Sequence, residues 1–194
     1  TLPEARLVQE QLRAQVRLAD EAAPPQTVAG VDVGFVEQGA VARAAVVVLR
    51  YPELTPLDYA IAFAPVTFPY VPGFLSFRET PVILAALAEL TTQPDLIICD
   101  GQGIAHPRRF GIACHLGVLL DRPTIGCAKS LLIGTHAPLP AERGARVELR
   151  DQGELIGWVL RTRANVRPVY VSPGHRVSLT TAVNLVVACT TRYR

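Results

Sequence analysis

The sequence predicts an α/β fold in which helices flank one mixed β-sheet, and two observations carry this prediction. The first is a set of three consecutive strand-like runs, over residues 27–36, 41–50 and 57–63. The second is the alternation of helix-like and strand-like segments in the rest of the chain. Strands joined by short links imply an antiparallel meander. The alternation implies parallel strands with helices packed on the sheet.

The first element predicted is an amphipathic helix over residues 4–21, where apolar residues recur at roughly helical spacing. The pair Pro24-Pro25 follows it as a stop signal. The meander comes next, with Gln38-Gly39 and the stretch 51–56 as its turns.

The second half begins with a helix over residues 81–90, for which Thr80 is the expected N-cap and Pro81 the first helical residue. The run LIIC at 96–99 is continuously apolar and predicts a buried strand. The remaining predictions are a helix at 109–120, a strand at 123–128, a hairpin of 147–149 with 155–160, a strand at 169–171 and a helix at 178–190.

This order of elements is that of the ribonuclease H-like fold, and we expect residues 1–194 to form a single domain of this kind. In such a sheet the first strand and the strand after the meander lie side by side and parallel. Asp32 sits inside the first of these strands, and Asp100 follows the carboxyl end of the second. Sites in sheets of this type gather at the carboxyl ends of strands.

Composition excludes several classes of protein. With 49% hydrophobic and 19% charged residues, the chain is too apolar to be disordered. No apolar run approaches the ~18 residues that a membrane-spanning helix needs, and the N-terminus lacks a secretory signal. We therefore expect a cytoplasmic protein, and a monomer. The net charge of +2 does not by itself indicate a nucleic-acid partner. The 4 cysteines include no CxxC pair, so a zinc site is not supported.

The two aspartates predict a metal site. Carboxylates about 4 Å apart repel by roughly 4 kcal/mol at an effective dielectric constant of 20. A pair such as Asp32 and Asp100 persists at low cost only if one protonates or a divalent cation lies between them. Ligand sets made of oxygen alone select Mg²⁺ or Mn²⁺, which suit phosphate chemistry.

Glu79 has two interpretations. Ser76 and Glu79 match a capping box, which would make Glu79 structural. Pro81 would then be the fifth helical residue, where its missing N–H matters. A helix that begins at Thr80-Pro81 avoids this problem and leaves Glu79 just outside the helix, facing the aspartates.

Three further residues are candidates for function. Lys129 is the one lysine among 19 basic residues, either by chance or because a compact ammonium is needed there. His175 is expected on a loop before the last helix, where a surface role is the alternative. Tyr70 lies between Pro69 and Pro72, in a stiff loop that could insert into a base stack or pack on the protein.

Several long motifs together resemble one known family. They are GVDVGF, PYVPGFLSFRE, PDLIICDGQGIAHPRRFGIACHLG, RPTIGCAKS and SPGHRVS. In this order they are similar to the endonuclease V family, the deoxyinosine-directed repair nucleases, from about residue 28 to residue 194. The resemblance implies a ribonuclease H-like fold and a Mg²⁺-dependent nuclease, with Mn²⁺ as a substitute. It also implies a nick at the second phosphodiester 3′ to inosine in DNA, which leaves a 3′-hydroxyl and a 5′-phosphate.

The resemblance also implies roles for individual residues. The metal and acid positions are Asp32, Glu79 and Asp100, and the catalytic basic positions are Lys129 and His175. The strand-separating wedge is formed by Pro69, Tyr70, Val71 and Pro72. The pocket for the extruded base is formed by Gly73, Leu75, Gly103, His106 and Ile112. Candidates for contacts to backbone phosphates are Arg108, Arg109 and Arg176, for which a solvated surface position is the alternative.

Two departures from the family pattern and two alternative functions remain open. Gln102 stands where relatives usually carry His, and it cannot titrate. The chain ends at Tyr193-Arg194, where many relatives continue, and loss of a basic tail would weaken DNA binding. The alternative functions are an inosine-specific endoribonuclease acting on RNA and an inosine-DNA binding module without turnover.

Overall fold

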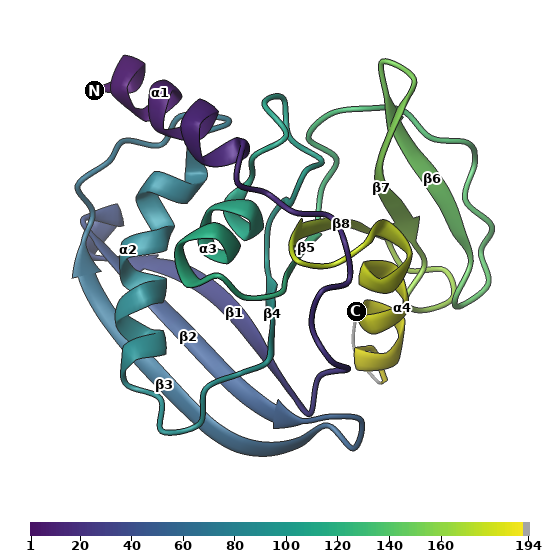
Figure 1. Cartoon of the computed structure of the whole chain (residues 1–194), viewed down its shortest axis with the longest axis horizontal. Coiled ribbons are helices and arrows are strands. Elements are labelled where there is room, and N and C mark those ends of the chain that lie inside the picture. Colours follow the sequence, from purple (N-terminus) through teal and green to yellow (C-terminus); the bar gives the residue numbers. More distant parts are fainter. Residues whose placement is uncertain (192–194) are drawn as a thin grey trace.

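The computed structural model describes residues 1–191, which build one eight-stranded mixed sheet and four α-helices; α2, α3 and α4 pack against the sheet, and α1 packs on α3 (Figure 1). The strand order is β3-β2-β1-β4-β5-β8-β7-β6. The strands are β1 (Thr27–Val36), β2 (Val41–Arg50), β3 (Thr55–Pro65), β4 (Leu96–Cys99), β5 (Thr124–Ala128), β6 (Arg146–Asp151), β7 (Glu154–Leu160) and β8 (Val169–His175). The helices are α1 (Leu2–Arg13), α2 (Leu75–Ala88), α3 (Ile112–Leu120) and α4 (Leu179–Cys189). The expectation about Tyr193-Arg194 lies outside the described residues.

The predicted fold class is confirmed. Strands β1, β2 and β3 form an antiparallel meander, and β4 pairs in parallel with both β1 and β5. The predicted bounds of β1, β2 and β4 match the structure. Strand β8 is longer than predicted and runs to His175, so the prediction that His175 lies on a loop is wrong. The pairing of β8 with β5 holds this extra length in the sheet.

The core lies on both faces of the sheet, and β4 illustrates why its sequence is apolar throughout. Ile97 and Cys99 belong to the cluster that packs under α2 and α3. Leu96 and Ile98 belong to the cluster that packs against α4. Because successive residues of a strand point to opposite faces, a strand covered on both sides has no polar position. Figure 1 shows α2 lying across the meander, and α4 beside the β6–β7 hairpin at the other end of the sheet.

The first helix is shorter than predicted, because α1 ends at Arg13 and not at residue 21. After it the chain continues without regular structure and is held by contacts to distant segments. The Arg17 N–H donates to Nδ1 of His175, and the Arg17 carbonyl accepts from the Arg176 N–H. Asp20 accepts from the backbone N–H and the hydroxyl of Ser178 at the start of α4. These tertiary contacts outweigh the helical periodicity of residues 14–21.

The predicted start of α2 is also wrong. The helix begins at Leu75, so Pro81 lies inside it and Glu79 belongs to its second turn. A proline in a helix interior costs roughly 3 kcal/mol. In α2 the side chain of Pro81 is exposed. Ser76, Glu79 and Thr80 are buried on the opposite side of the first turns. Burial of these residues against the sheet and α3 offsets the cost of Pro81.

Among residues 1–191, no helix combines the length and the apolar character required to cross a membrane.

Candidate nuclease site

The sheet topology brings Asp32 and Asp100 together. Strand β1 pairs with β4 from Val28 opposite Leu96 to Val31 opposite Cys99, and the two aspartates are the next residue of each strand. The Asp100 N–H donates to the Val31 carbonyl at 3.1 Å, which extends the pairing by one step. The side chain of Asp32 is exposed and that of Asp100 is 28% exposed. Two carboxylates therefore lie side by side at the edge of the sheet.

Glu79 reaches the same place from α2. Its side chain is buried, and burial raises the pKa of its carboxyl group from 4.5 to about 7, with the negative charges of Asp100 and Asp32 adding to the effect. A carboxyl group in this state is stabilised in its ionised form when positive charge arrives. The predicted proximity of Glu79 to the aspartates is therefore found, although Glu79 occupies a helical position.

Lys129 supplies one positive charge to this acidic cluster. It follows the carboxyl end of β5, and its Nζ forms a hydrogen bond and an ion pair with Asp100 Oδ2. Its side chain is 63% exposed, so the ammonium faces solvent as well as Asp100. Among residues 1–191, three carboxylates and one ammonium meet here, which leaves an excess of negative charge.

The donor set fits a hard divalent cation, since all three acidic side chains offer oxygen atoms and carry excess charge. In residues 1–191 no three acidic, histidine or cysteine side chains are arranged closely enough to hold an ion as they stand. Lys129 pairs with Asp100 in this arrangement, so a bound ion would share Asp100 with the ammonium.

The carboxylates line a cleft of about 330 Å³ that also contains the predicted wedge. Tyr70, Val71 and Pro72 border this cleft, and Tyr70 is 70% exposed. Pro69 is exposed at the start of the same loop. The loop begins at Phe68, whose ring packs on Phe77 with centroids 5.5 Å apart. An anchored loop therefore presents an exposed aromatic ring beside the acidic cluster.

Four of the five predicted base-pocket residues line the same cleft, namely Gly73, Leu75, His106 and Ile112. Gly103 does not line it. Its N–H donates to Ser172 Oγ at 2.9 Å, and a Cβ at this position would lie 2.1 Å from the Pro173 carbonyl oxygen. Gly103 is therefore buried where the segment after β4 meets β8.

The electrostatic state of His106 is defined by its contacts. The Arg108 N–H donates to Nδ1 at 3.2 Å, so the proton of the neutral ring lies on Nε2, which donates to the Gly73 carbonyl at 3.1 Å. Burial, followed by the charge of Arg108, lowers the pKa of His106 to about 4. The cleft thus contains a neutral imidazole at pH 7.

Sequence reasoning missed other residues that line the cleft. They are Val33, Ser76, Gly101, Phe110, Gly111, Ala128, Ser130 and Leu132. Gln102, which the sequence singles out, also lines the cleft, and its Nε2 donates to the Ser130 carbonyl at 3.0 Å. Ser76 lies one turn before Glu79 on α2 and would have been found from the correct start of that helix. Ala128 and Ser130 flank Lys129, so their proximity was available from the sequence.

The structure does not bring His175 to this cleft. His175 pairs with Thr124 at the amino end of β5, whereas Lys129 follows Ala128 at the carboxyl end. Four residues of strand separate the two ends by about 13 Å. His175 is 2% exposed and hydrogen bonds to the Arg17 N–H and to Asp121. The position of His175 therefore does not support the predicted catalytic role.

The three arginines predicted to contact phosphates are engaged within the protein. Arg109 forms ion pairs with Asp151 at 2.8 Å and Glu154 at 2.7 Å. Arg176 pairs with Asp121 at 3.3 Å. Arg108 donates to the Gly73 carbonyl. A phosphate would have to replace these partners, so the structure favours structural roles for all three arginines.

A ribonuclease H-like sheet with a carboxylate cluster at the ends of adjacent strands defines a metal-dependent nuclease. The endonuclease V family model matches residues 10–194, and the chain belongs to this family. The endonuclease V of Roseiflexus castenholzii is 62% identical over 193 residues, which cover 100% of this chain and 86% of that protein.

Solved structures agree with this assignment. The endonuclease V of Streptomyces avermitilis is 47% identical with a TM-score of 0.94, and the match covers 100% of this chain and 86% of that one. The Ciona intestinalis endonuclease V, in complex with a 24mer DNA that contains an inosine followed by a ribo-adenosine, is 29% identical with a TM-score of 0.84. That match covers 97% of this chain and 89% of the Ciona chain.

Proposed function

We propose that this chain is a DNA repair endonuclease that recognises deoxyinosine and hydrolyses the second phosphodiester bond on its 3′ side with Mg²⁺. The observation that carries the proposal is the continuity of one cleft. Asp32, Glu79 and Asp100 line it together with the exposed ring of Tyr70 and the neutral imidazole of His106. Cutting, strand separation and base recognition thus share a single surface.

The recognition step uses the wedge side of the cleft. Extruding a base costs a few kcal/mol, and the cost is lower for a mispaired hypoxanthine than for a matched purine. The exposed Tyr70 ring fills the gap in the stack, and the apolar walls at Leu75 and Ile112 enclose the extruded base. Neutral His106 adds no charge to this wall, which suits an uncharged hypoxanthine.

The cutting step uses the acidic side. Asp32, Asp100 and Glu79 would hold the ion, which when bound neutralises charge on the phosphate and lowers the pKa of a bound water. Lys129 keeps an exposed ammonium beside Asp100, where it stabilises the additional negative charge of the pentacovalent phosphate. Because the pKa of Glu79 is raised to about 7, positive charge that arrives at the site favours its ionised form, in which it would ligate the ion or orient the attacking water.

The test is a nicking assay on a strand that bears one deoxyinosine, with and without Mg²⁺. We expect cleavage only with the metal and only at the second bond 3′ to the lesion. A product of different length, or equal cleavage of a strand with adenine in place of inosine, would contradict the proposal.

A second candidate substrate is inosine-containing RNA. The observation in its favour is the ribo-adenosine that follows the inosine in the DNA bound by the Ciona relative. Comparing the same sequence as DNA, as RNA and as DNA with a single ribonucleotide after the inosine distinguishes the two substrates. A higher kcat/KM for the all-RNA strand would assign the chain to RNA.

A further inference from the structure

The wedge loop, defined as residues 69–72, is tied to the protein at both of its ends. On one side, Arg78 Nη1 donates to the Phe68 carbonyl at 3.3 Å. On the other, the Phe74 N–H donates to the Val71 carbonyl at 3.0 Å and closes a turn. The residue within that turn, Gly73, also lines the base pocket. Any group that orients Gly73 therefore sets the wedge and the pocket wall together.

The carbonyl of Gly73 accepts hydrogen bonds from three side chains. The donors are Gln9 Nε2 at 3.0 Å, His106 Nε2 at 3.1 Å and Arg108 Nη2. The backbone of Gly73 has φ = +80°, and a Cβ there would lie 2.9 Å from Arg108 Nη2. The positive φ favours glycine at this position, and the arginine approaches it closely.

Gln9 is an unusual member of α1. It is 1% exposed, whereas the helix buries only one other residue, Ala5. A buried amide needs partners for both of its ends. Its Nε2 donates to the Gly73 carbonyl, and its Oε1 accepts from Arg108 Nε. Burying a glutamine in a helix that otherwise faces solvent is costly unless these bonds are made.

Gln9 also orients Arg108. With Nε bound to Gln9 and Nη2 bound to Gly73, the guanidinium lies over the Phe74 ring, 4.3 Å from its centroid. Arg108 comes from the segment between β4 and α3, while Phe74 immediately precedes α2. Gln9 is thus the point at which α1, the segment after β4 and the wedge loop are joined.

We propose that Gln9 is a positioning residue for lesion recognition: it fixes the Gly73 carbonyl and Arg108, so that the wedge and the base pocket keep their relative geometry before DNA binds. This inference rests on the proposed function. The physical basis is preorganisation, because a loop already held in its binding geometry loses less conformational entropy when the base is extruded. Gln9 touches neither the carboxylates nor Lys129, so the chemical step is independent of it.

The test compares Gln9→Ala with Gln11→Ala, the same substitution at an exposed position of the same helix. For Gln9→Ala we expect the KM for inosine-containing duplex to rise about tenfold, with kcat and the half-saturating Mg²⁺ concentration within about twofold of wild type. Tenfold corresponds to about 1.4 kcal/mol, the size of one hydrogen bond. Discrimination against the adenine duplex falls by the same factor, whereas Gln11→Ala behaves as wild type.

Two further variants keep the result interpretable. Gln9→Met retains the volume of the side chain and removes both hydrogen bonds, so it carries the test if Gln9→Ala fails to fold. Gln9→Glu keeps an acceptor for Arg108 but turns a carboxylate oxygen toward the Gly73 carbonyl. We expect Gln9→Glu to raise KM at least as much as Gln9→Ala, because repulsion replaces the bond to Gly73.

A readout without activity separates the inference from the proposed function. Amide hydrogen exchange of residues 68–75 should accelerate about tenfold in Gln9→Ala and Gln9→Met and stay unchanged in Gln11→Ala. If wild type does not nick inosine-containing DNA, the proposed function fails while exchange still tests the anchoring. If Gln9 variants match Gln11→Ala in both KM and exchange, the positioning role is overturned.

Discussion

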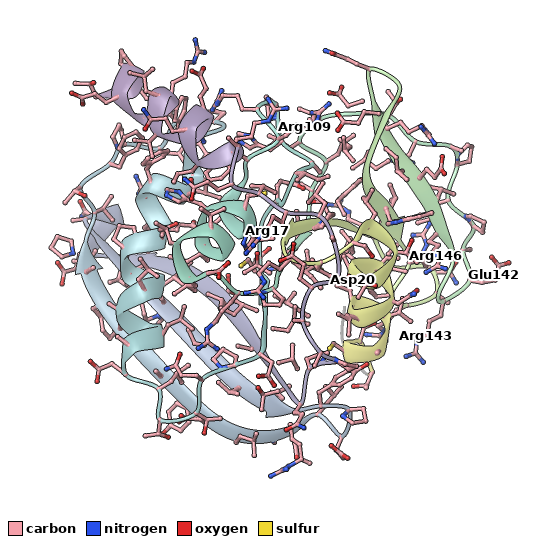
Figure 2. All side chains as sticks on the ribbon, viewed as in Figure 1. Arg17, Asp20, Arg109, Glu142, Arg143 and Arg146 are labelled. Atoms are coloured by element: carbon pink, nitrogen blue, oxygen red, sulfur yellow. The ribbon has the colours of Figure 1, made fainter. Side chains whose placement is uncertain are left out.

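The two ends of the central sheet each gather charged side chains, and they do so in opposite ways. At the carboxyl ends of β1 and β4, three carboxylates meet one ammonium, and the buried member, Glu79, has its pKa raised to about 7. At the other end, Arg17 and Arg176 lie between Asp121 and Glu21. Figure 2 shows Arg17 over the middle of the molecule, beside α3.

The second cluster is balanced, with two carboxylates and two guanidinium groups around a buried His175. The backbone N–H of Arg17 donates to Nδ1 of this ring at 3.2 Å, and Nε2 lies 3.3 Å from Asp121. Every charge there has a partner within the protein, so the cluster fastens the N-terminal segment to β8. An acidic excess, by contrast, persists at low cost only if a carboxyl group takes up a proton or a cation is added. In this protein the balance of charge therefore distinguishes the structural cluster around His175 from the candidate metal site, although both are built from charged side chains.

The largest expected effect is a loss of nicking activity on substitution at the acidic end of the sheet. Asp100→Asn should reduce nicking of an inosine-containing strand by about 1000-fold, because one oxygen ligand loses its charge. The fold should persist, since the substitution also removes like-charge repulsion. The matched control is Asp121→Asn at the balanced end, where we expect activity within about twofold of wild type. Single-turnover rates at saturating Mg²⁺ measure both, and loss of less than tenfold for Asp100→Asn would refute the metal model.

The next effect compares a cationic side chain at each end of the sheet, the ammonium of Lys129 and the guanidinium of Arg17. Lys129→Met should lower kcat by about 100-fold, because the exposed ammonium no longer stabilises charge on the phosphate. Arg17→Met, at the balanced end, should leave kcat unchanged. Lys129→Arg tests whether a compact ammonium is required, and we expect it to remain impaired because the planar guanidinium has a different shape. Wild-type rates for Lys129→Arg would mean that positive charge alone is sufficient.

A smaller effect, on the free energy of unfolding, is expected at the balanced cluster. His175→Ala leaves the Arg17 N–H without its buried acceptor, so the free energy of unfolding should fall by about 1–3 kcal/mol. Nicking at a temperature where the variant is folded should remain within about twofold. Chemical denaturation and the nicking assay measure the two quantities. A folded His175→Ala variant that is inactive would restore the catalytic role predicted from the sequence.

The smallest effect compares buried histidines by pH. His115, whose Nδ1 contacts Ser76 at the cleft, has its pKa lowered by burial from 6.5 to about 4. The unfolded chain then binds more protons between pH 6.5 and 4, so stability is lost as the pH falls through this window. The slope is up to about 1.4 kcal/mol per pH unit. His115→Gln should remove the contribution of His115 to this slope from denaturation curves and leave that of His106, whose pKa is also lowered to about 4.

For His175→Gln we expect a smaller change in slope, since the Asp121 carboxylate opposes the lowering of the His175 pKa by burial. Equal pH dependence of His115→Gln and wild type between pH 6.5 and 5 would contradict the assignment of His115 as a buried neutral ring.

Local patterns in the sequence determined the sheet and the position of its aspartates. The strand-like runs at 27–36 and 41–50 and the uninterrupted apolar run of β4 predicted strands at their observed bounds, while β3, predicted over 57–63, is longer in the structure. Parallel pairing of these strands then placed Asp32 beside Asp100. The prolines around Tyr70 predicted a stiff loop and left open whether its ring is presented to a base stack or packed on the protein; in the structure the ring is 70% exposed. The strands and the loop needed only neighbours along the chain, whereas the placement of the two aspartates also needed the fold class.

Tertiary structure decided the features whose partners are distant in sequence. Because one side of α2 is buried, the helix starts before Pro81 and includes Glu79, against the local helix signals. Contacts between residues more than 150 positions apart in sequence end α1 early and hold Arg17 against His175, away from the cleft. Gln9 bonds to Gly73 across 64 residues. A helix cap is worth about 1 kcal/mol and a proline inside a helix costs roughly 3 kcal/mol, so packing and buried hydrogen bonds overrule these local signals where the two disagree.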